Sequence, residues 1–160
     1  MESYITILAE KLGHLLLEKK LKLVTAESCT GGGIAYAITS ISGSSQWFER
    51  GFVTYSNLSK QKLLNIDNNI INIHGAVSEE TVILMAEGAL QNSEADISIA
   101  VTGIAGPDGG SATKPVGTVW FGLARKNFPT KSLYQYFSGD REEIREKSIQ
   151  AGLDFLCHSF

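Results

Sequence analysis

The hydrophobic pattern of the N-terminal half predicts helices that alternate with short buried strands. Residues 2–19 carry apolar side chains at helical spacing, on a stripe of Ile5, Leu8, Leu12, Leu15 and Leu16. Residues 21–26 form a β-rich run typical of a buried strand. The predicted elements of this half are a helix over 2–19, a strand over 21–26, a helix from Gly31-Gly32-Gly33 to about Ser40, a strand over 48–56 and a short helix through Leu64 that Ser56 or Asn57 can cap.

The C-terminal half predicts one more helix, then three consecutive strands and a final helix. Ser78 is a good N-cap with Glu79 and Glu80 behind it, and apolar residues from Val82 to Ala89 share one face. The remaining predicted elements are a strand over 97–103, a glycine-rich loop over 104–116, two strands within 117–126 and 132–140 joined by a turn at 127–130, and a helix over 141–157 that starts with a capping box of Asp140 and Glu143.

This order of elements favours an α/β fold. Helices between the early strands imply parallel crossovers, and the consecutive late strands imply antiparallel pairing. We therefore expect a three-layer α/β/α sandwich with a mixed, mostly parallel sheet of about five strands. At 160 residues the chain fits a single domain over 1–160.

Composition and charge exclude several classes of partner. The formal net charge of -3 gives no general attraction to nucleic acid or to an anionic membrane. No apolar run approaches the length of a membrane span, and the N-terminus does not resemble a signal peptide. Cys29 and Cys157 are too sparse for a disulfide framework, so the cytoplasm is the expected compartment. A homo-oligomer remains open.

Three loops with unusual residues follow predicted strands, at residues 27–33, 55–60 and 102–110. In open α/β sheets, ligands bind in the crevice at the carboxyl ends of the strands. We therefore expect these three loops to form one site.

The first loop resembles a nucleophile turn around Ser28. A serine between a strand and a helix lies near unpaired backbone N–H groups, which can stabilise an oxyanion, and glycines allow close approach of a substrate. The alternative is structural: Ser28 or Thr30 caps the helix, and the glycines permit tight packing. The loop residues assigned to substrate binding are Cys29, Thr30, Gly31 and Gly32.

A serine nucleophile needs a base, and Lys60 is the preferred candidate. It falls near the first turn of its helix, where the dipole disfavours an ammonium, and burial would have to lower its pKa further. Lys62 should be solvated. The alternative is that Lys60 is an ordinary surface lysine. Of the histidines, only His74 lies near a plausible site, whereas His14 and His158 do not.

The third loop contributes Thr102, Gly103 and Gly106 as further candidate binding residues. It matches neither the dinucleotide-binding fingerprint nor a Walker A loop, because its glycine spacing is wrong and no helix follows. No cluster of His, Cys, Asp and Glu has metal-ligand spacing, so neither a metal nor another cofactor is expected.

Five stretches taken together resemble the nicotinamide-nucleotide amidase family, which also forms the C-terminal domain of the competence/damage-inducible protein CinA. They are TAESCTGGGIA (25–35), GFVTYSNLSKQKLL (51–64), GAVSEETV (75–82), AVTGIAGPDGGSATKPVGTVWFGLA (100–124) and FSGDREEIRE (137–146). The stretches run across nearly the whole chain in the same order, which makes the resemblance highly specific.

The resemblance implies an α/β/α fold and hydrolysis of nicotinamide mononucleotide to nicotinic acid mononucleotide and ammonia. It also implies a Ser-Lys arrangement with a nearby tyrosine, which falls on Ser28, Lys60 and Tyr55. The small-molecule partner would then be a pyridine nucleotide. Longer family members carry an additional N-terminal domain, and activities of that domain are not expected here.

Two competing functions stay open at this point. The chain could be a catalytically silent nucleotide-binding module that acts with a partner in competence or DNA-damage response. It could also be a thiol amidase, because Cys29 stands beside Ser28 near a helix N-terminus. Adjacent residues rarely share an orientation, so only one of the two can occupy the nucleophile position.

Arg141 and Arg145 are candidate ligands for the substrate phosphate. At 100° per residue they share the face of the last helix that carries Ile149 and Leu153. Cations there oppose the helix dipole where the core should begin, and an anionic ligand would resolve the conflict. The alternative is that they pair with Glu142, Glu146 or another carboxylate, or extend to water.

Overall fold

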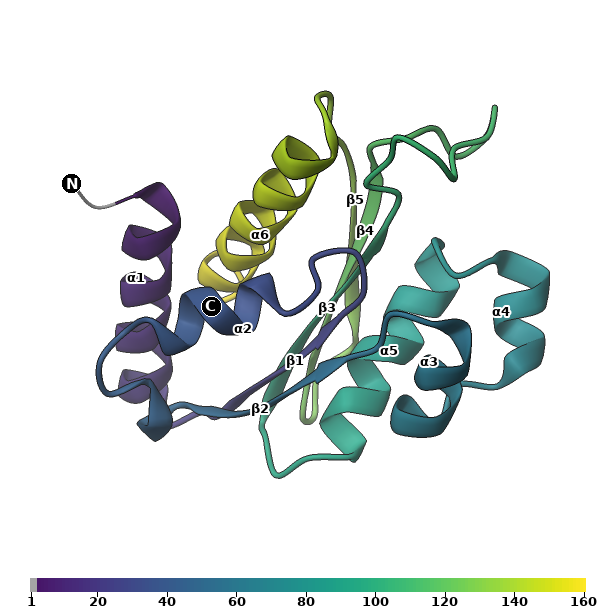
Figure 1. Ribbon diagram of the computed structural model, residues 1–160. Helices are drawn as coiled ribbons and strands as arrows, with labels where there is room; N and C mark the ends of the chain where they lie inside the picture. The colour runs from purple at the N-terminus through teal and green to yellow at the C-terminus, as the bar shows by residue number, and fades with distance from the viewer. Residues whose placement is uncertain (1–2) are drawn as a thin grey trace.

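The computed structural model describes residues 3–160 and shows a sheet with helices on both faces (Figure 1). The helices are α1 (Tyr4–Lys19), α2 (Gly33–Thr39), α3 (Asn57–Leu64), α4 (Asn68–His74), α5 (Glu79–Gln91) and α6 (Arg141–Cys157), with one 3₁₀ turn, η1 (Ser44–Gln46). The strands are β1 (Leu23–Glu27), β2 (Phe48–Val53), β3 (Ile97–Gly103), β4 (Thr118–Arg125) and β5 (Lys131–Tyr136). None of the helices within 3–160 is long and apolar enough to cross a membrane.

The sheet is mixed, as the order of elements predicts, with the strands arranged β2-β1-β3-β4-β5. β1 pairs in parallel with both β2 and β3, whereas β4 pairs antiparallel with β3 and with β5. Four strands therefore run in one direction and β4 runs against them, which agrees with a mostly parallel sheet. β1 lies at the centre of the parallel part and is buried along its whole length.

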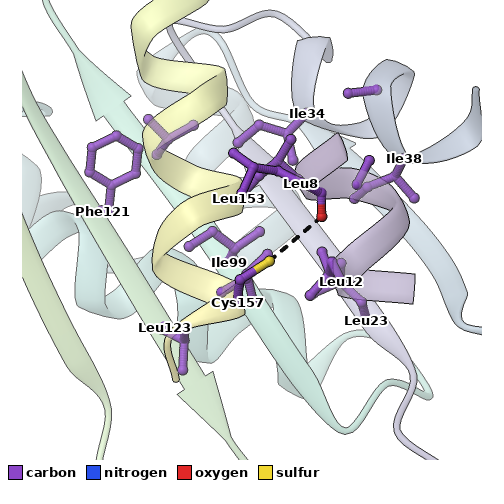
Figure 2. Close-up of a cluster of buried hydrophobic side chains, with 14 of the residues drawn as sticks. Leu8, Leu12, Leu23, Ile34, Ile38, Ile99, Phe121, Leu123, Leu153 and Cys157 are labelled. Carbon is purple, nitrogen blue, oxygen red and sulfur yellow. Dashed lines mark hydrogen bonds between the residues drawn. The ribbon is translucent and has the colours of Figure 1, made fainter. Parts of the chain in front are cut away.

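Each face of the sheet carries its own apolar core. α1, α2 and α6 cover one face and α3, α4 and α5 cover the other (Figure 1). Figure 2 shows the first core, where Leu153 and Cys157 of α6 lie beside residues of α1 and of the sheet. There the Cys157 thiol donates to the backbone oxygen of Leu8 over 3.6 Å, so this cysteine is free and structural.

The predicted helix starts are confirmed by the hydrogen bonds at the caps. Ser56 and Ser78 accept the backbone N–H of Ser59 and Thr81, respectively. Asp140 and Glu143 form the reciprocal capping box of α6. α1 begins at Tyr4, and Ser3 is its N-cap. The start predicted at residue 2 lies outside the described residues.

The sequence pattern did not predict α4. Asp67 caps this helix by accepting the N–H of Asn69, and Ile71 is its one buried residue. A seven-residue helix with a single buried side chain shows no apolar stripe, so periodicity could not indicate it. α2 also begins at Gly33 rather than Gly31, because Gly31 and Gly32 have φ of 60° and 96°.

Gly88 determines how closely α3 approaches α5, and it generates the first prediction. A Cβ added at Gly88 would overlap the carbonyl oxygen of Leu64 at the end of α3. Alanine at an open helix position stabilises relative to glycine by about 0.8–1 kcal/mol. We expect Gly88→Ala to lower the free energy of unfolding by about 1–3 kcal/mol instead, as overpacked sites do.

Urea denaturation of Gly88→Ala beside Gln91→Ala, an exposed position on the same helix, measures this effect. The control should stay within about 0.5 kcal/mol of the wild type. A gain in stability for Gly88→Ala would show that α3 does not pack against α5 as described.

Candidate active site

The loop between β1 and α2 holds Ser28 at the carboxyl end of the central strand. The Ser28 N–H donates to the oxygen of Val101 at 3.0 Å, which continues the pairing of β1 with β3. The Gly31 N–H donates back to the oxygen of Ser28 at 3.0 Å and closes a tight turn. Gly31 and Gly32 have positive φ, a backbone conformation that glycine adopts without strain and that other residues rarely adopt. We call residues 28–32 the nucleophile turn.

Neither Ser28 nor Thr30 caps α2, so the capping interpretation of these residues is wrong. The N-cap is Gly32, which has no side chain to accept a hydrogen bond. The carboxylate of Glu27 serves instead: it accepts the N–H of Ile34 at 2.8 Å and of Ala35 at 3.0 Å. It also accepts the Thr30 hydroxyl at 2.5 Å. The Ser28 hydroxyl is thereby left available for another partner.

Lys60 points from α3 directly at that hydroxyl. Its Nζ lies 3.2 Å from Ser28 Oγ, and it donates to the backbone oxygens of Thr54 at 2.9 Å and Tyr55 at 3.2 Å. Lys60 is 1% exposed, and burial lowers the pKa of its ammonium from 10.5 to about 8. The surface-lysine interpretation is therefore wrong, whereas Lys62 is solvent-exposed as predicted.

The two residues stand in a cavity of about 250 Å³ built from all three predicted loops and from α6. Ser28 and Lys60 are among its buried members, whereas Tyr55 is 63% exposed and Arg141 is also exposed, so these two lie nearer the solvent. The lining residues are Ser28, Cys29, Tyr55, Asn57, Lys60, Ala76, Val77, Thr102, Gly103, Ala105 and Arg141. A site with a buried reactive pair and a solvent-facing cation can take a small polar substrate with an anionic end.

The other binding residues predicted from the sequence do not all line the cavity that holds Ser28 and Lys60. Thr30, Gly31 and Gly32 line a larger neighbouring groove of about 520 Å³, which contains neither Ser28 nor Lys60. Thr102 lines the cavity, but its hydroxyl donates to the oxygen of Ala76 at 2.9 Å. Gly106 contributes its backbone oxygen, which accepts a hydrogen bond from Arg141.

The two arginines of α6 do not pair with carboxylates within residues 3–160. Arg141 donates to the oxygen of Gly106 at 2.7 Å and to the Tyr55 hydroxyl at 3.2 Å. Arg145 donates to the oxygens of Cys29 at 3.1 Å and Thr30 at 3.3 Å. The alternative interpretation, in which they pair with Glu142, Glu146 or another carboxylate, is therefore wrong for these residues, and the arginines contact the loops of the site instead.

Neither the neighbouring cysteine nor the histidines can replace the Ser28–Lys60 pair. Burial raises the pKa of the Cys29 thiol to about 12, so it stays protonated at neutral pH. His74 ends α4 with its Nδ1 3.6 Å from a Glu80 oxygen and does not line the cavity. His14 and His158 are exposed and lie outside the cavity as well.

Sequence reasoning missed several residues of the site. Asn57, Ala76 and Val77 line the cavity, although the sequence suggested no substrate-binding role for any of them. Glu27 was given no role either, yet it is 1% exposed and organises the turn. Glu27 could have been recognised as a charged residue at the end of a predicted buried strand. A buried carboxylate requires hydrogen-bond donors, and the N–H groups at the start of the following helix are the nearest ones. Within the described chain, no group of three or more His, Cys, Asp or Glu could hold a metal.

Comparison with known proteins places this site in one family. Residues 5–160 match the family model described as the CinA C-terminal domain. The nicotinamide-nucleotide amidohydrolase PncC of Enterobacter agglomerans is 54% identical over 153 residues, which cover 96% of this chain and 93% of that protein. PncC of Escherichia coli K12 is 46% identical over 159 residues, covering 99% of this chain and 96% of that protein.

A solved structure with the same fold supports the assignment. The crystal structure of the competence/damage inducible protein CihA from Agrobacterium tumefaciens superimposes with a TM-score of 0.94 at 42% identity. The match covers 98% of this chain and 95% of that one.

The buried amine makes stability depend on pH, and this gives the second prediction. Because the folded-state pKa of Lys60 is about 8 and its ordinary value is 10.5, the unfolded chain binds the extra proton between these values. Burial of the amine therefore costs stability at and below about pH 8, and this cost disappears as the pH rises above 10.5. One pKa unit corresponds to about 1.4 kcal/mol, so the full change is about 3.5 kcal/mol, and about 3 kcal/mol of it falls between pH 7.5 and 10.5.

We expect the unfolding free energy of the wild type to rise by that amount relative to Lys60→Met between pH 7.5 and 10.5. Urea titrations at several pH values measure the difference. Lys62→Met, an exposed substitution on the same helix, should show a difference from wild type that does not change with pH. A flat difference for Lys60→Met as well would mean that the Lys60 amine is solvated.

Proposed function

Because the chain belongs to the CinA C-terminal domain family, we propose that it hydrolyses the carboxamide of nicotinamide mononucleotide to nicotinic acid mononucleotide and ammonia. The amidohydrolases that match almost the whole chain support this substrate. We assign Ser28 as the nucleophile and Lys60 as its base. No cofactor takes part in this mechanism.

One geometric observation carries the assignment of the base. A neutral lysine amine has two N–H donors and one lone pair. The backbone oxygens of Thr54 and Tyr55 can only accept, so they take both N–H groups of the neutral amine. The lone pair is then left for Ser28, whose hydroxyl is the one partner able to donate. The two carbonyls therefore orient neutral Lys60 as an acceptor of the Ser28 proton.

The first half of the reaction forms an acyl-enzyme. Ser28 Oγ attacks the carboxamide carbon while its proton passes to Lys60 Nζ. The negative oxygen of the tetrahedral intermediate is held by backbone N–H groups of the nucleophile turn. Collapse breaks the carbon–nitrogen bond, and the proton on Lys60 passes to the leaving nitrogen, either directly or through the Tyr55 hydroxyl, which gives its own proton and takes the one from Lys60. Ammonia departs, and Lys60 is neutral again.

The second half releases the acid. Water adds to the acyl carbon while Lys60 takes one of its protons, and collapse then breaks the ester bond to Ser28. The proton on Lys60 returns to Ser28 Oγ, and the substrate leaves as its carboxylate with release of one proton. The pyridinium charge of the substrate makes its carboxamide carbon more electrophilic throughout.

The exposure of the lining residues supports one orientation of the substrate. The carboxamide enters toward the buried Ser28 and Lys60, and the phosphate stays near the exposed Arg141. Among the described residues that line the cavity, Lys60 and Arg141 are the cations, and Lys60 is committed to Ser28. Arg141 is therefore our candidate for the phosphate, with Tyr55 as its immediate neighbour.

The competing functions account for less of this geometry. A silent nucleotide-binding module has no need of a buried lysine with a lowered pKa against a serine hydroxyl. A thiol mechanism requires a thiolate, and burial raises rather than lowers the pKa of Cys29.

The test of the proposed function is ammonia release from nicotinamide mononucleotide by the purified protein, and it includes the third prediction. Ser28→Ala should lower turnover by about 10³-fold or more, because it removes the nucleophile. Cys29→Ala should keep at least a third of the wild-type rate, since it removes only a buried thiol beside the nucleophile. Loss of activity in Cys29→Ala with retention in Ser28→Ala would falsify the assignment.

The fourth prediction concerns the phosphate. A hydrogen bond to a charged group is worth about 1.5–3 kcal/mol, so Arg141→Met should raise KM for the mononucleotide roughly 10-fold to 100-fold. Nicotinamide riboside lacks the phosphate, and its kcat/KM should change less than about 3-fold. Steady-state kinetics on both substrates measure the contrast.

Arg50→Met removes an exposed arginine of β2 that pairs with Glu49, away from the cavity, and should leave both substrates unaffected. Equal losses on mononucleotide and riboside in Arg141→Met would mean that Arg141 only supports Tyr55 and Gly106.

A further inference from the structure

Arg145 contacts the backbone of the nucleophile turn rather than the cavity. Its Nε and Nη2 donate to the oxygens of two consecutive residues, Cys29 and Thr30, at 3.1 and 3.3 Å. The guanidinium is a rigid planar fork, so one side chain restrains two neighbouring peptide groups at once. Arg145 is half-buried and lines the 520 Å³ groove on the other side of the turn from Lys60.

The direction of the Thr30 N–H follows from the bond of Arg145 to Cys29, and that of the Cys29 N–H follows from the turn bond between Ser28 and Gly31. In a trans peptide the C=O and the following N–H point in opposite directions. The oxygen of Cys29 is turned toward Arg145, so the N–H of Thr30 is turned away from it. The oxygen of Ser28 accepts the Gly31 N–H, so the N–H of Cys29 points away from that bond.

These two N–H groups are the unpaired donors that directly follow Ser28. Within residues 3–160, the N–H groups of Cys29, Thr30 and Gly32 donate to no protein oxygen, whereas those of Ser28, Gly31 and Gly33 do. Unpaired N–H groups directly after a nucleophile are the kind of donor that stabilises an oxyanion.

Glu27 restrains the same peptides from inside the protein. Its buried carboxylate holds the Thr30 hydroxyl and the first N–H groups of α2. Thr30 is thus bound through its side chain by an anion and through its carbonyl by a cation. Neither group donates to or accepts from the Ser28 hydroxyl.

We propose that Arg145 is a positioning residue that, with Glu27, holds the nucleophile turn in the orientation in which the N–H groups of Cys29 and Thr30 receive the negative oxygen of the tetrahedral intermediate. This role replaces the phosphate contact expected for Arg145 from the sequence. The inference rests on the proposed function, because it takes Ser28 as the atom that is acylated.

The two roles predict different kinetics, which supplies the fifth prediction. Loss of an oxyanion donor typically lowers kcat by about 10²–10³-fold. Arg145→Met should therefore lower kcat at least tenfold on the mononucleotide and on the riboside alike, with KM changed by less than about 3-fold. A phosphate ligand would instead affect KM for the mononucleotide alone.

A substrate-independent readout uses phenylmethanesulfonyl fluoride. Ser28 Oγ forms a bond to sulfur, fluoride leaves, and the Ser28 proton passes to Lys60; the rate is followed by intact-protein mass spectrometry from pH 6.5 to 9.5. We expect Arg145→Met to slow labelling at least tenfold while the midpoint of the pH profile stays where the wild type has it. A change in Lys60 would move that midpoint, and loss of the donors would not.

Controls separate the outcomes. Lys147→Met removes a cation of α6 whose one hydrogen bond within the described residues goes to the Ser138 oxygen, and it should label as the wild type does.

Circular dichroism checks that each variant folds. If Arg145→Met does not fold, Arg145→Lys replaces it, because lysine keeps the charge without the planar fork. Arg145→Lys should still label more slowly than the wild type. Absence of Ser28 labelling in the wild type contradicts the proposed function itself. Wild-type labelling matched by both Arg145 variants overturns only the positioning role.

Discussion

The removal of the Lys60 amine from water is the constraint on which the site depends. A fully solvated lysine is almost entirely protonated at neutral pH and rarely able to accept the Ser28 proton. Burial lowers the pKa of Lys60 to about 8, which raises the neutral fraction at pH 7 to about a tenth, and the oxygens of Thr54 and Tyr55 fix the direction of the amine. Both conditions require α3 to lie against the sheet and α5, and Gly88 permits that approach because its missing Cβ leaves room for the Leu64 carbonyl.

The sheet brings the loops of the site together although they are far apart in the sequence. β1 lies between two parallel neighbours, so the carboxyl ends of β2, β1 and β3 meet at one edge. Pairing extends past the strands: the Thr54 N–H donates to the oxygen of Glu27, and the Ser28 N–H donates to that of Val101. These bonds align the segment that leads to Lys60 with the segment that carries Ser28. The backbone of the sheet therefore determines how Ser28, the proposed nucleophile, lies relative to Lys60, its proposed base.

Much of this arrangement could be predicted from sequence because it depends on local signals. Ser56, Ser78 and Asp140 mark helix starts, and the buried runs mark β1 and β3. The pairing of Ser28 with Lys60 rested on resemblance and on loop positions, since spacing along the chain gives no distance. α4 was missed because one buried residue makes no stripe. Periodicity correctly predicted that Arg145 faces the core side of its helix, toward the loops of the site. It could not show whether the partner of Arg145 there is a phosphate or, as the structure shows, two backbone carbonyls.

The same desolvation acts oppositely on the two reactive groups beside Ser28. A base that is cationic when protonated loses its charge more easily in a medium of low polarity, whereas an acid that becomes anionic loses its proton less easily. Burial accordingly lowers the pKa of Lys60 to about 8 and raises that of Cys29 to about 12. A thiolate mechanism would need a cation held against the sulfur, but the hydrogen bonds of Lys60 Nζ go to Ser28 and two carbonyls, and Arg145 donates to the backbone of the turn. Because a neutral amine and a neutral hydroxyl are the forms that a dry site favours, the burial that keeps the cysteine protonated favours the roles proposed for Ser28 and Lys60.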